Sequence, residues 1–521
     1  MRVVSRNTAV ATVVCALVLS GCAGGLPRER GYRQTGELLE ARLGFAPAWP
    51  QEAATPQPSG PLSMEQAVRL AFLHNPAIRQ AYARLGLRRA DLEEARRLSN
   101  PGFGWSRLKT RGDAGVQITR SLSLGFSELL LLPARQRFAT GELARTQQIV
   151  AAELLALATA VETAWLRCVS AHQVAAMRGV VAQAAEAGAE LAQRFFDAGN
   201  IDRLALAREQ AAAAEARIAA VRADATALRA RAQLADRLGL SSHGDWQTPT
   251  TLPLPPPLAP DMAVERLLQA ALEQRLDLIA ARQRVQLQED AWRFARRWRW
   301  LGEVRLGVER EREPDGAVAR GPTLDLELPL FHQGQAGIER GQAALLDARA
   351  RLDALLIQVQ NEVRVAVDQL RTAHAVSERY RSALVPQREA IVARTQEKVN
   401  FMLIGVFELL QARQQEYDAW QEYLEAVRDV WIARTVLAQR VGGELPDAVP
   451  IDTLPLLGVE PTQPQSPAAE GHEHHQQRHP PRPATPPATP PQAPAHEQGP
   501  SHGAQPAPGH DHRHQPDGET P

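Results

Sequence analysis

Two stretches, "FDAGNIDRLAL" (196–206) and "MLIGVFELLQA" (402–412), decide the fold, because the second repeats the plan of the first. In each, a glycine stands between two long helical patterns and marks a reversal of the chain. The glycines are Gly199 and Gly405, and each is followed three positions later by an acidic residue and five positions later by a leucine: Asp202, Glu408, Leu204 and Leu410. The shared spacing predicts an internal duplication.

Long helical arms flank both turns. In the first half, Pro133 opens a helical pattern that runs to about Asp197, and helix resumes from Asp202 to Leu238. At 1.5 Å per residue the first arm extends about 95 Å, which compact domains rarely need. In the second half, the arm after Gly337 runs to about Asn400, and a return arm follows. Paired arms of this length are expected to coil around each other.

Each half also contains two runs with strand periodicity ahead of its long arm. The first half has Phe103–Arg111 and Val116–Leu124, the latter interrupted on its apolar side by Arg120. The second half has a run beginning at Val304 and another spanning 323–330. The polar side chains of these runs are expected to face a lumen, and they are Gln117, Thr119, Ser121, Ser123, Asp325 and Glu327.

The duplication sets the domain boundaries. Residues 61–249 form the first repeat, 250–260 a Pro-rich linker, and 261–445 the second repeat. Each begins with a helix, over 61–100 and 262–300. In the first of these helices, Ser63 and Gln66 have the spacing of a capping box.

Closure of the sheet requires several chains. Four strands cannot enclose an open lumen, whereas twelve strands from three chains can, and closure removes exposed edges. No stretch after residue 22 reads as a transmembrane helix, so we expect any membrane crossing to be a β-barrel. The expected fold class is mainly α with a small β part: long coiled hairpins form an α-barrel, and four strands per protomer complete a trimeric 12-stranded β-barrel.

The N-terminus has the features of a lipoprotein signal peptide over residues 1–22. The segment ends in Leu-Ser-Gly-Cys, which resembles the bacterial lipobox, so Cys22 is expected to carry acyl chains such as palmitate. Ala23 at the next position is compatible with the outer membrane. An ordinary signal peptide with an incidental Cys is the alternative. Residues 23–60 are expected to be an irregular spacer.

The C-terminal segment 446–521 is rich in Pro and His, and it is expected to be disordered. Imidazole suits copper, nickel and zinc, and His-x-His spacing lets two rings reach one ion. The candidate metal ligands are His472, His474, His475, His479, His510, His512 and His514. The alternative is a solvated tail that binds metal incidentally. Cys168, within a helical arm, is expected to be a buried inert thiol.

Several motifs resemble the TolC-type outer-membrane efflux family, over nearly all of 61–443. They are "LSMEQAVRLAFLHNPAIR" (62–79), "RLDLIAARQRV" (275–285), "LDLELPLFHQGQAGIERGQA" (324–343) and the two turns. Their order and spacing together are specific, although each alone is weak. The sequence departs from the family at Leu276, where Pro is common, and at His332, where an acidic residue is common.

The resemblance implies a homotrimeric outer-membrane duct with a large periplasmic part, a periplasmic adaptor and an inner-membrane pump, such as one of the RND type. Its entrance is expected at the turns, with Asp197, Gly199, Asn200, Asp202, Gly405 and Glu408. Asp202 and Glu408 fit equally well as residues that favour a helix N-terminus. With the tail, the resemblance indicates export of metal cations such as copper, or of small toxic compounds. Peptide or protein secretion, or a periplasmic metal-binding scaffold, are the alternatives.

Other function classes have no support in the sequence. No nucleophile elbow, phosphate loop or pair of catalytic carboxylates stands out, so no enzymatic activity is expected. Beyond metal binding by the tail, no cofactor is expected. Lys plus Arg and Asp plus Glu both number 59, so no overall charge attracts nucleic acid.

Overall fold

The computed structural model describes residues 30–45, 60–109, 115–258, 263–443 and 445. All of these residues belong to the first of two units, Met1–Val459. The second unit, Glu460–Pro521, contains none of the described residues. The signal peptide, Cys22 and the tail histidines also lie outside the described residues, so their expected roles stay predictions.

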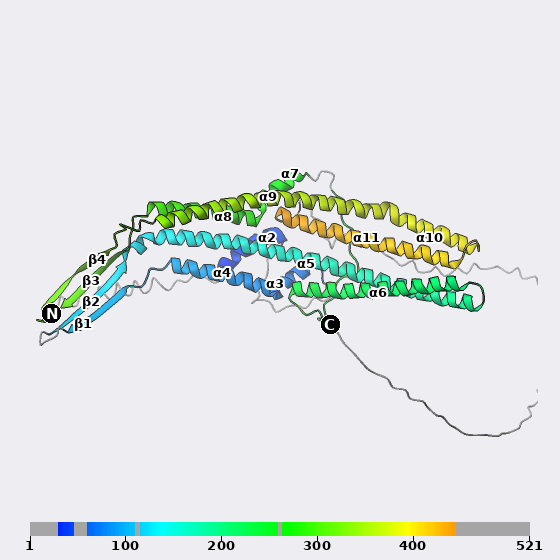
Figure 1. Ribbon diagram of the computed structural model, residues 1–521, viewed down its shortest axis with the longest axis horizontal. Coiled ribbons are helices and arrows are strands. Elements are labelled where there is room, and N and C mark those ends of the chain that lie inside the picture. The colour runs from blue at the N-terminus through cyan, green and yellow to red at the C-terminus, as the bar shows by residue number, and fades with distance from the viewer. Residues whose placement is uncertain (1–29, 46–59, 110–114, 259–262, 444, 446–521) are drawn as a thin grey trace, which may run out of the picture. The chain divides into compact units, whose positions relative to one another are not determined.

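The two repeats have matching element orders (Figure 1). The first consists of α3 (Met64–His74), α4 (Pro76–Ala95), β1 (Gly102–Lys109), β2 (Val116–Gly125), α5 (Phe126–Asp197) and α6 (Arg203–Leu238). The second consists of α7 (Val264–Gln274), α8 (Leu276–Arg297), β3 (Val304–Arg312), β4 (Val318–Leu326), α9 (Gln335–Arg379), a π-helical turn (Tyr380–Leu384), α10 (Val385–Asn400) and α11 (Val406–Val441). The predicted mainly α fold with four strands per chain is confirmed.

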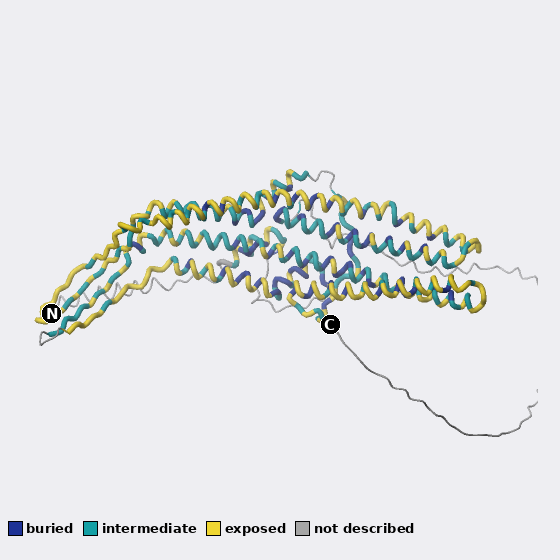
Figure 2. Tube along the Cα trace, viewed as in Figure 1, coloured by how far each residue is buried: buried dark blue, intermediate teal, exposed yellow. Residues whose placement is uncertain are grey.

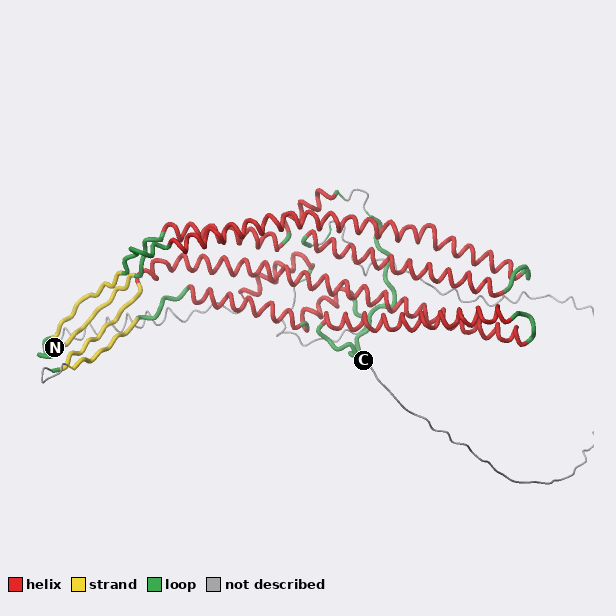
Figure 3. The backbone as a smooth tube through the Cα atoms, in the orientation of Figure 1, coloured by secondary structure: helices red, strands yellow, loops and turns green. Residues whose placement is uncertain are grey.

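Within this unit the strands and the hairpin turns lie at opposite ends (Figure 3). The four strands form one antiparallel sheet in the order β1-β2-β3-β4, so β1 and β4 are its edges. α5 and the run from α9 to α10 extend from the sheet to the two turns, and α6 and α11 return from the turns to about the middle of the unit (Figure 1). The duplication therefore gives two similar hairpins that share one sheet.

A repeated contact fixes the start of each repeat against its return helix. α6 ends at Gly239 and α11 at Gly442, both with positive φ. A Cβ on Gly239 would lie 2.7 Å from the His74 carbonyl oxygen. The break after His74 is capped by Asn75, whose side chain donates to the Arg237 carbonyl at 2.7 Å.

Arg275 takes the place of Asn75 in the second repeat, where Leu276 replaces Pro76. Its buried guanidinium pairs with Asp277 and Glu362 at 2.7 and 2.8 Å. The helix therefore breaks at the same point without a proline, held by an ion-paired side chain. This break divides the helix expected over 262–300, as the Asn75–Pro76 break divides the one expected over 61–100.

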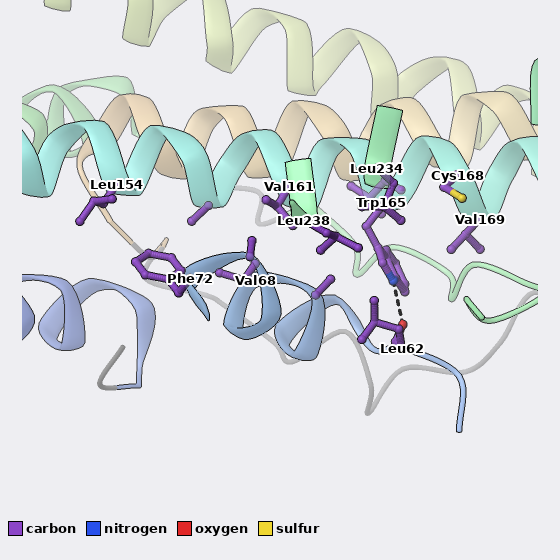
Figure 4. Close-up of a cluster of buried hydrophobic side chains, with 14 of the residues drawn as sticks. Leu62, Val68, Phe72, Leu154, Val161, Trp165, Cys168, Val169, Leu234 and Leu238 are labelled. Atoms are coloured by element: carbon purple, nitrogen blue, oxygen red, sulfur yellow. Dashed lines mark hydrogen bonds between the residues drawn. The ribbon is translucent and has the colours of Figure 1, made fainter. Parts of the chain in front are cut away.

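The main core forms where α3, α5 and α6 meet (Figure 4). Buried residues gather about halfway along the helices, as Figure 2 shows. The Trp165 indole donates to the Leu62 carbonyl at 2.8 Å, which satisfies its buried N–H. Phe72 is 1% exposed, and burying such a side chain contributes about 1.5–3 kcal/mol. The predicted capping box at Ser63 and Gln66 is present.

One correction concerns the expected spacer at 23–60, since part of it is the helix α2 (Arg30–Leu43). Leu39 is fully buried in the main core. Arg42 joins α2 to the second repeat by donating to the carbonyls of Gln274 and Gly442, at 2.9 and 3.2 Å. The helix is short and stands between Pro- and Gly-rich segments, which concealed it in the sequence.

Two element boundaries also differ from expectation. α5 begins at Phe126, directly after β2, so Pro133 lies inside the helix rather than opening it. β4 spans Val318–Leu326 and not 323–330. A tight turn at Gly316 starts β4 early, because the Glu313 amide donates to the Ala317 carbonyl at 2.9 Å.

α5 contains a window that is long and apolar enough to cross a membrane by length and composition, contrary to the sequence expectation. Of that window, 44% is buried inside the chain. Ala- and Leu-rich helices of a protein core have the same composition, so this window is weak support for a membrane span.

Candidate functional site

The first hairpin turn is closed by a left-handed glycine. Gly199 has φ +75°, and its amide donates to the Phe196 carbonyl at 2.9 Å. The Asn200 amide donates to the Phe195 carbonyl at 2.8 Å, which completes a Schellman motif. The expected role of Gly199 in the reversal is confirmed.

The two aspartates of this turn are exposed and held by local hydrogen bonds. Asp202 caps α6 by accepting from the Ala205 amide at 2.7 Å. Asp197 accepts from the Gln193 side chain at 2.8 Å. Asp202 therefore acts as a helix cap, and its carboxylate still contributes negative charge at the turn.

The second turn closes differently. Gly405 has φ −78°, a conformation open to any residue, and Met402 is the left-handed residue with φ 57°. The reversal therefore occurs where Gly405 marks it, but Met402 and not Gly405 supplies the left-handed backbone conformation. The turn exposes the apolar side chains of Phe401, Met402 and Leu403, which are 77%, 93% and 71% exposed. These three residues are not among the predicted entrance residues, because Gly405 is the turn signal in this segment of the sequence.

The two hairpins pack against each other close to their turns. Phe195 and Phe407 meet edge to face, with ring centroids 6.1 Å apart. A groove of about 450 Å³ lies between the hairpins, and both Glu209 and Glu408 line it. Burial raises the pKa of Glu209, and repulsion from Glu408 adds to the rise.

Glu209 was not among the expected entrance residues. It lies seven positions after Asp202, two helical turns along α6, and this spacing is a signal that could have identified it. The structure thus brings Glu408 together with Glu209.

The strand register separates two faces of the sheet, because directly paired residues share a face. Five of the expected polar residues fall on one of them: Gln117, Thr119, Ser121, Ser123 and Asp325. Glu327 follows β4, and its amide donates to the Glu303 carbonyl. We call the face that contains these five residues the polar face.

Every carboxylate within the four strands lies on the polar face. They are Glu309, Glu311 and Asp325. Glu311 accepts a hydrogen bond from the Gln117 side chain on the neighbouring strand. Glu309 and Glu311 are not among the predicted lumen residues, although they continue the alternation of the run that begins at Val304.

The opposite face, which we call the apolar face, is the more exposed one. Phe103, Trp105, Val308, Leu324 and Leu326 are each more than half exposed. On β2, the polar-face residues are only partly exposed. An exposed apolar surface of this kind is expected to contact another molecule or a bilayer.

No metal-binding group was found in the described part of the chain, where no three His, Cys, Asp or Glu residues are suitably arranged. Cys168 is buried, and burial raises the pKa of its thiol to about 11. The predicted inert role of this thiol agrees with that environment.

No protein-family model matches the chain. Protein CyaE of Bordetella pertussis is 27% identical over 452 residues, which cover 80% of this chain and 92% of CyaE.

The solved structures that are similar over most of their length include two outer-membrane proteins. The outer membrane protein VceC of Vibrio cholerae aligns with a TM-score of 0.60 at 17% identity, over 73% of this chain and 96% of VceC. The CmeC outer membrane channel of Campylobacter jejuni aligns with a TM-score of 0.62 at 13% identity, over 77% of this chain and 92% of CmeC. The chain therefore has the fold of the TolC-type outer-membrane channels, as its duplicated motifs predicted.

Proposed function

We propose that three copies of this chain form a passive export duct across the outer membrane, with the helical hairpins extending into the periplasm. The observation that carries the proposal is the separation of the sheet into a polar face and an exposed apolar face. In a closed barrel, such a sheet turns its apolar face to lipid and its polar face to a lumen.

The sheet edges support closure by several copies. β1 and β4 lack partners on their outer sides within the described chain. The unpaired backbone N–H and C=O groups of such edges are energetically costly in lipid, which contains no water to bind them. β1 runs away from the helices and β4 returns towards them, so β4 of one copy and β1 of the next are antiparallel. Three copies continue the pattern into twelve strands.

The carboxylates suit the conduction of cations. Three copies would contribute three each of Glu309, Glu311 and Asp325 to the lumen, and rings of acidic side chains favour cations. Glu209 and Glu408 add negative charge at the hairpin end. A duct performs no chemistry, so the driving force must come from a partner such as an inner-membrane pump of the RND type.

The apolar second turn supports docking of a periplasmic adaptor. Phe401, Met402 and Leu403 are strongly exposed at the end of the hairpin. Apolar side chains at such an exposed turn are suited to pack against a protein partner. We infer that the adaptor contacts this turn, while lipid on Cys22 anchors the chain in the membrane.

The His-rich tail carries the proposal that the cargo is a metal cation such as copper. Deleting 460–521 should lower tolerance to copper or zinc and leave drug tolerance unchanged. Unchanged tolerance to every metal would contradict the proposed role of the tail but not the proposal that the chain forms a duct.

The duct itself is tested in planar bilayers with the full-length protein. We expect channels that prefer cations, with a preference that falls in Glu309→Gln and Glu311→Gln. The matched control is Glu94→Gln, an exposed glutamate on α4 that should leave the preference unchanged. Absence of any conductance from correctly folded protein would contradict the duct and favour the scaffold alternative.

A further inference from the structure

Charge divides between the two faces of the sheet as sharply as polarity does. The apolar face carries no carboxylate within the four described strands. It carries six basic side chains, namely Arg107, Lys109, Arg120, Arg310, Arg312 and Arg320. The polar face holds one basic strand residue, Arg305, which pairs with Glu303 at 2.6 Å. The excess of positive charge is thus confined to the apolar face.

Three of these arginines form a row across the sheet. The register pairs Trp105 with Arg120, Arg120 with Arg310, and Arg310 with Arg320. Like charges directly opposite each other destabilise a sheet. None of the three arginines forms an ion pair or side-chain hydrogen bond to another described residue. The repulsion among these three arginines therefore favours the binding of an anion from outside the described chain.

The row borders a hollow of about 450 Å³ whose walls are amphipathic. Phe103, Leu122 and Val308 supply its apolar side, and the three arginines supply its basic side. Ser121, Glu309 and Gly321, which belong to the polar face by register, complete the lining. A ligand with an anionic group next to an apolar chain fits these two sides.

The row also marks the edge of the apolar band. The two rows nearer the helices are Phe103–Leu122–Val308–Pro322 and Leu124–Leu306–Leu324. Beyond the row, Arg107 and Arg312 stand on the side of the strand turns. Tryptophan is enriched where a bilayer meets water, and Trp105 belongs to this row. A tryptophan beside basic side chains, as in Trp105 and the three arginines, is the composition found where a protein crosses from bilayer to water.

We propose that Arg120, Arg310 and Arg320 bind the phosphate of a bilayer lipid whose headgroup carries a net negative charge, in the leaflet farther from the helical hairpins. This proposal rests on the duct proposed above, since it requires the apolar face to lie in a membrane. Guanidinium groups bind phosphate oxygens in a bidentate manner, and the acyl chain of the lipid would lie along Phe103, Leu122 and Val308. The bound anion would relieve the repulsion within the row.

The test is native mass spectrometry of the full-length protein in detergent, titrated with phosphatidylglycerol or with phosphatidylcholine. We expect the anionic lipid to bind preferentially, and Arg310→Gln to weaken its binding about tenfold, which corresponds to about 1.4 kcal/mol. Arg305→Gln, on the same strand but the opposite face, should leave binding unchanged. Arg310→Lys should weaken it less than Arg310→Gln does, since it keeps the charge.

Equal retention of phosphatidylglycerol by Arg310→Gln and the unaltered protein would overturn the proposal. So would complete displacement of the lipid by excess inorganic phosphate, which would indicate a site for free anions. Conductance of the same preparations separates the two proposals. Channels that conduct without lipid selectivity overturn the lipid site alone, whereas folded protein without channels contradicts the duct.

Discussion

Leu324 and Thr323 are adjacent on β4 but lie on opposite faces, so an arginine at each tests which face meets lipid. Leu324 is four residues from Arg320, which is about 13 Å along a strand and about 10 Å along the membrane normal at a 35–45° tilt. If the arginine row marks one edge of an apolar band about 25 Å tall, Leu324 lies close to the bilayer midplane.

Arginine at that depth costs about 2–4 kcal/mol per chain, or roughly 6–12 kcal/mol for three copies. Leu324→Arg should therefore remove most of the assembled protein from outer-membrane fractions. Thr323→Arg should assemble nearly normally, because Thr323 lies on the polar face, which the proposed duct turns to its lumen, and its partner Gly307 leaves room for a longer side chain.

Both variants are compared by the amount of heat-modifiable oligomer in outer-membrane fractions. Their free energies of folding into phosphatidylcholine vesicles follow from denaturant titration. If Thr323→Arg proved as damaging as Leu324→Arg, or more so, the assignment of the two faces would be refuted.

Three further predictions concern the helical part. A left-handed alanine costs about 1–2 kcal/mol. Gly239→Ala should lower the free energy of unfolding by more than that amount, because its Cβ would also clash with the His74 carbonyl oxygen. Gly199→Ala has open space around it and should lower the free energy of unfolding by only that amount, and denaturant titrations of the two variants measure the difference. Cys168 should resist maleimide at pH 8 in the folded protein and react after unfolding, as peptide mapping can check, because its pKa of about 11 keeps the thiol protonated. The raised pKa of Glu209 means that the folded state holds its proton more tightly, so the hairpin contact should be strongest below the ordinary value of 4.5 and weaken as pH rises through the raised value. Hydrogen exchange along α6 would measure this trend, and Glu209→Gln should abolish it.

The duplicated order of elements was predictable because long helices and strands repeat their apolar residues at a regular spacing over many positions. Alternation in the strand runs and the helical spacing of the arms follow from local burial, which the sequence records directly. The break at Arg275 was not predictable in the same way. It depends on Glu362, which is distant in the chain and pairs with the guanidinium only after folding.

The candidate site was predicted in part, for similar reasons. The conformation of Gly199 was predictable because a left-handed backbone favours glycine, whereas Met402 adopts the same conformation although a methionine gives no such signal. Glu209 became relevant only when α11 packed against α6 and brought Glu408 close. The arginine row likewise emerges only from the register, because Arg120, Arg310 and Arg320 belong to three different strands.

The central claim, that several copies share one wall, is tested most directly by the native mass of the full-length protein released from the outer membrane in mild detergent. The account predicts a single species that contains three chains and separates into single chains only on denaturation. A folded species that contains one chain, at concentrations where its β-structure is intact, would contradict it.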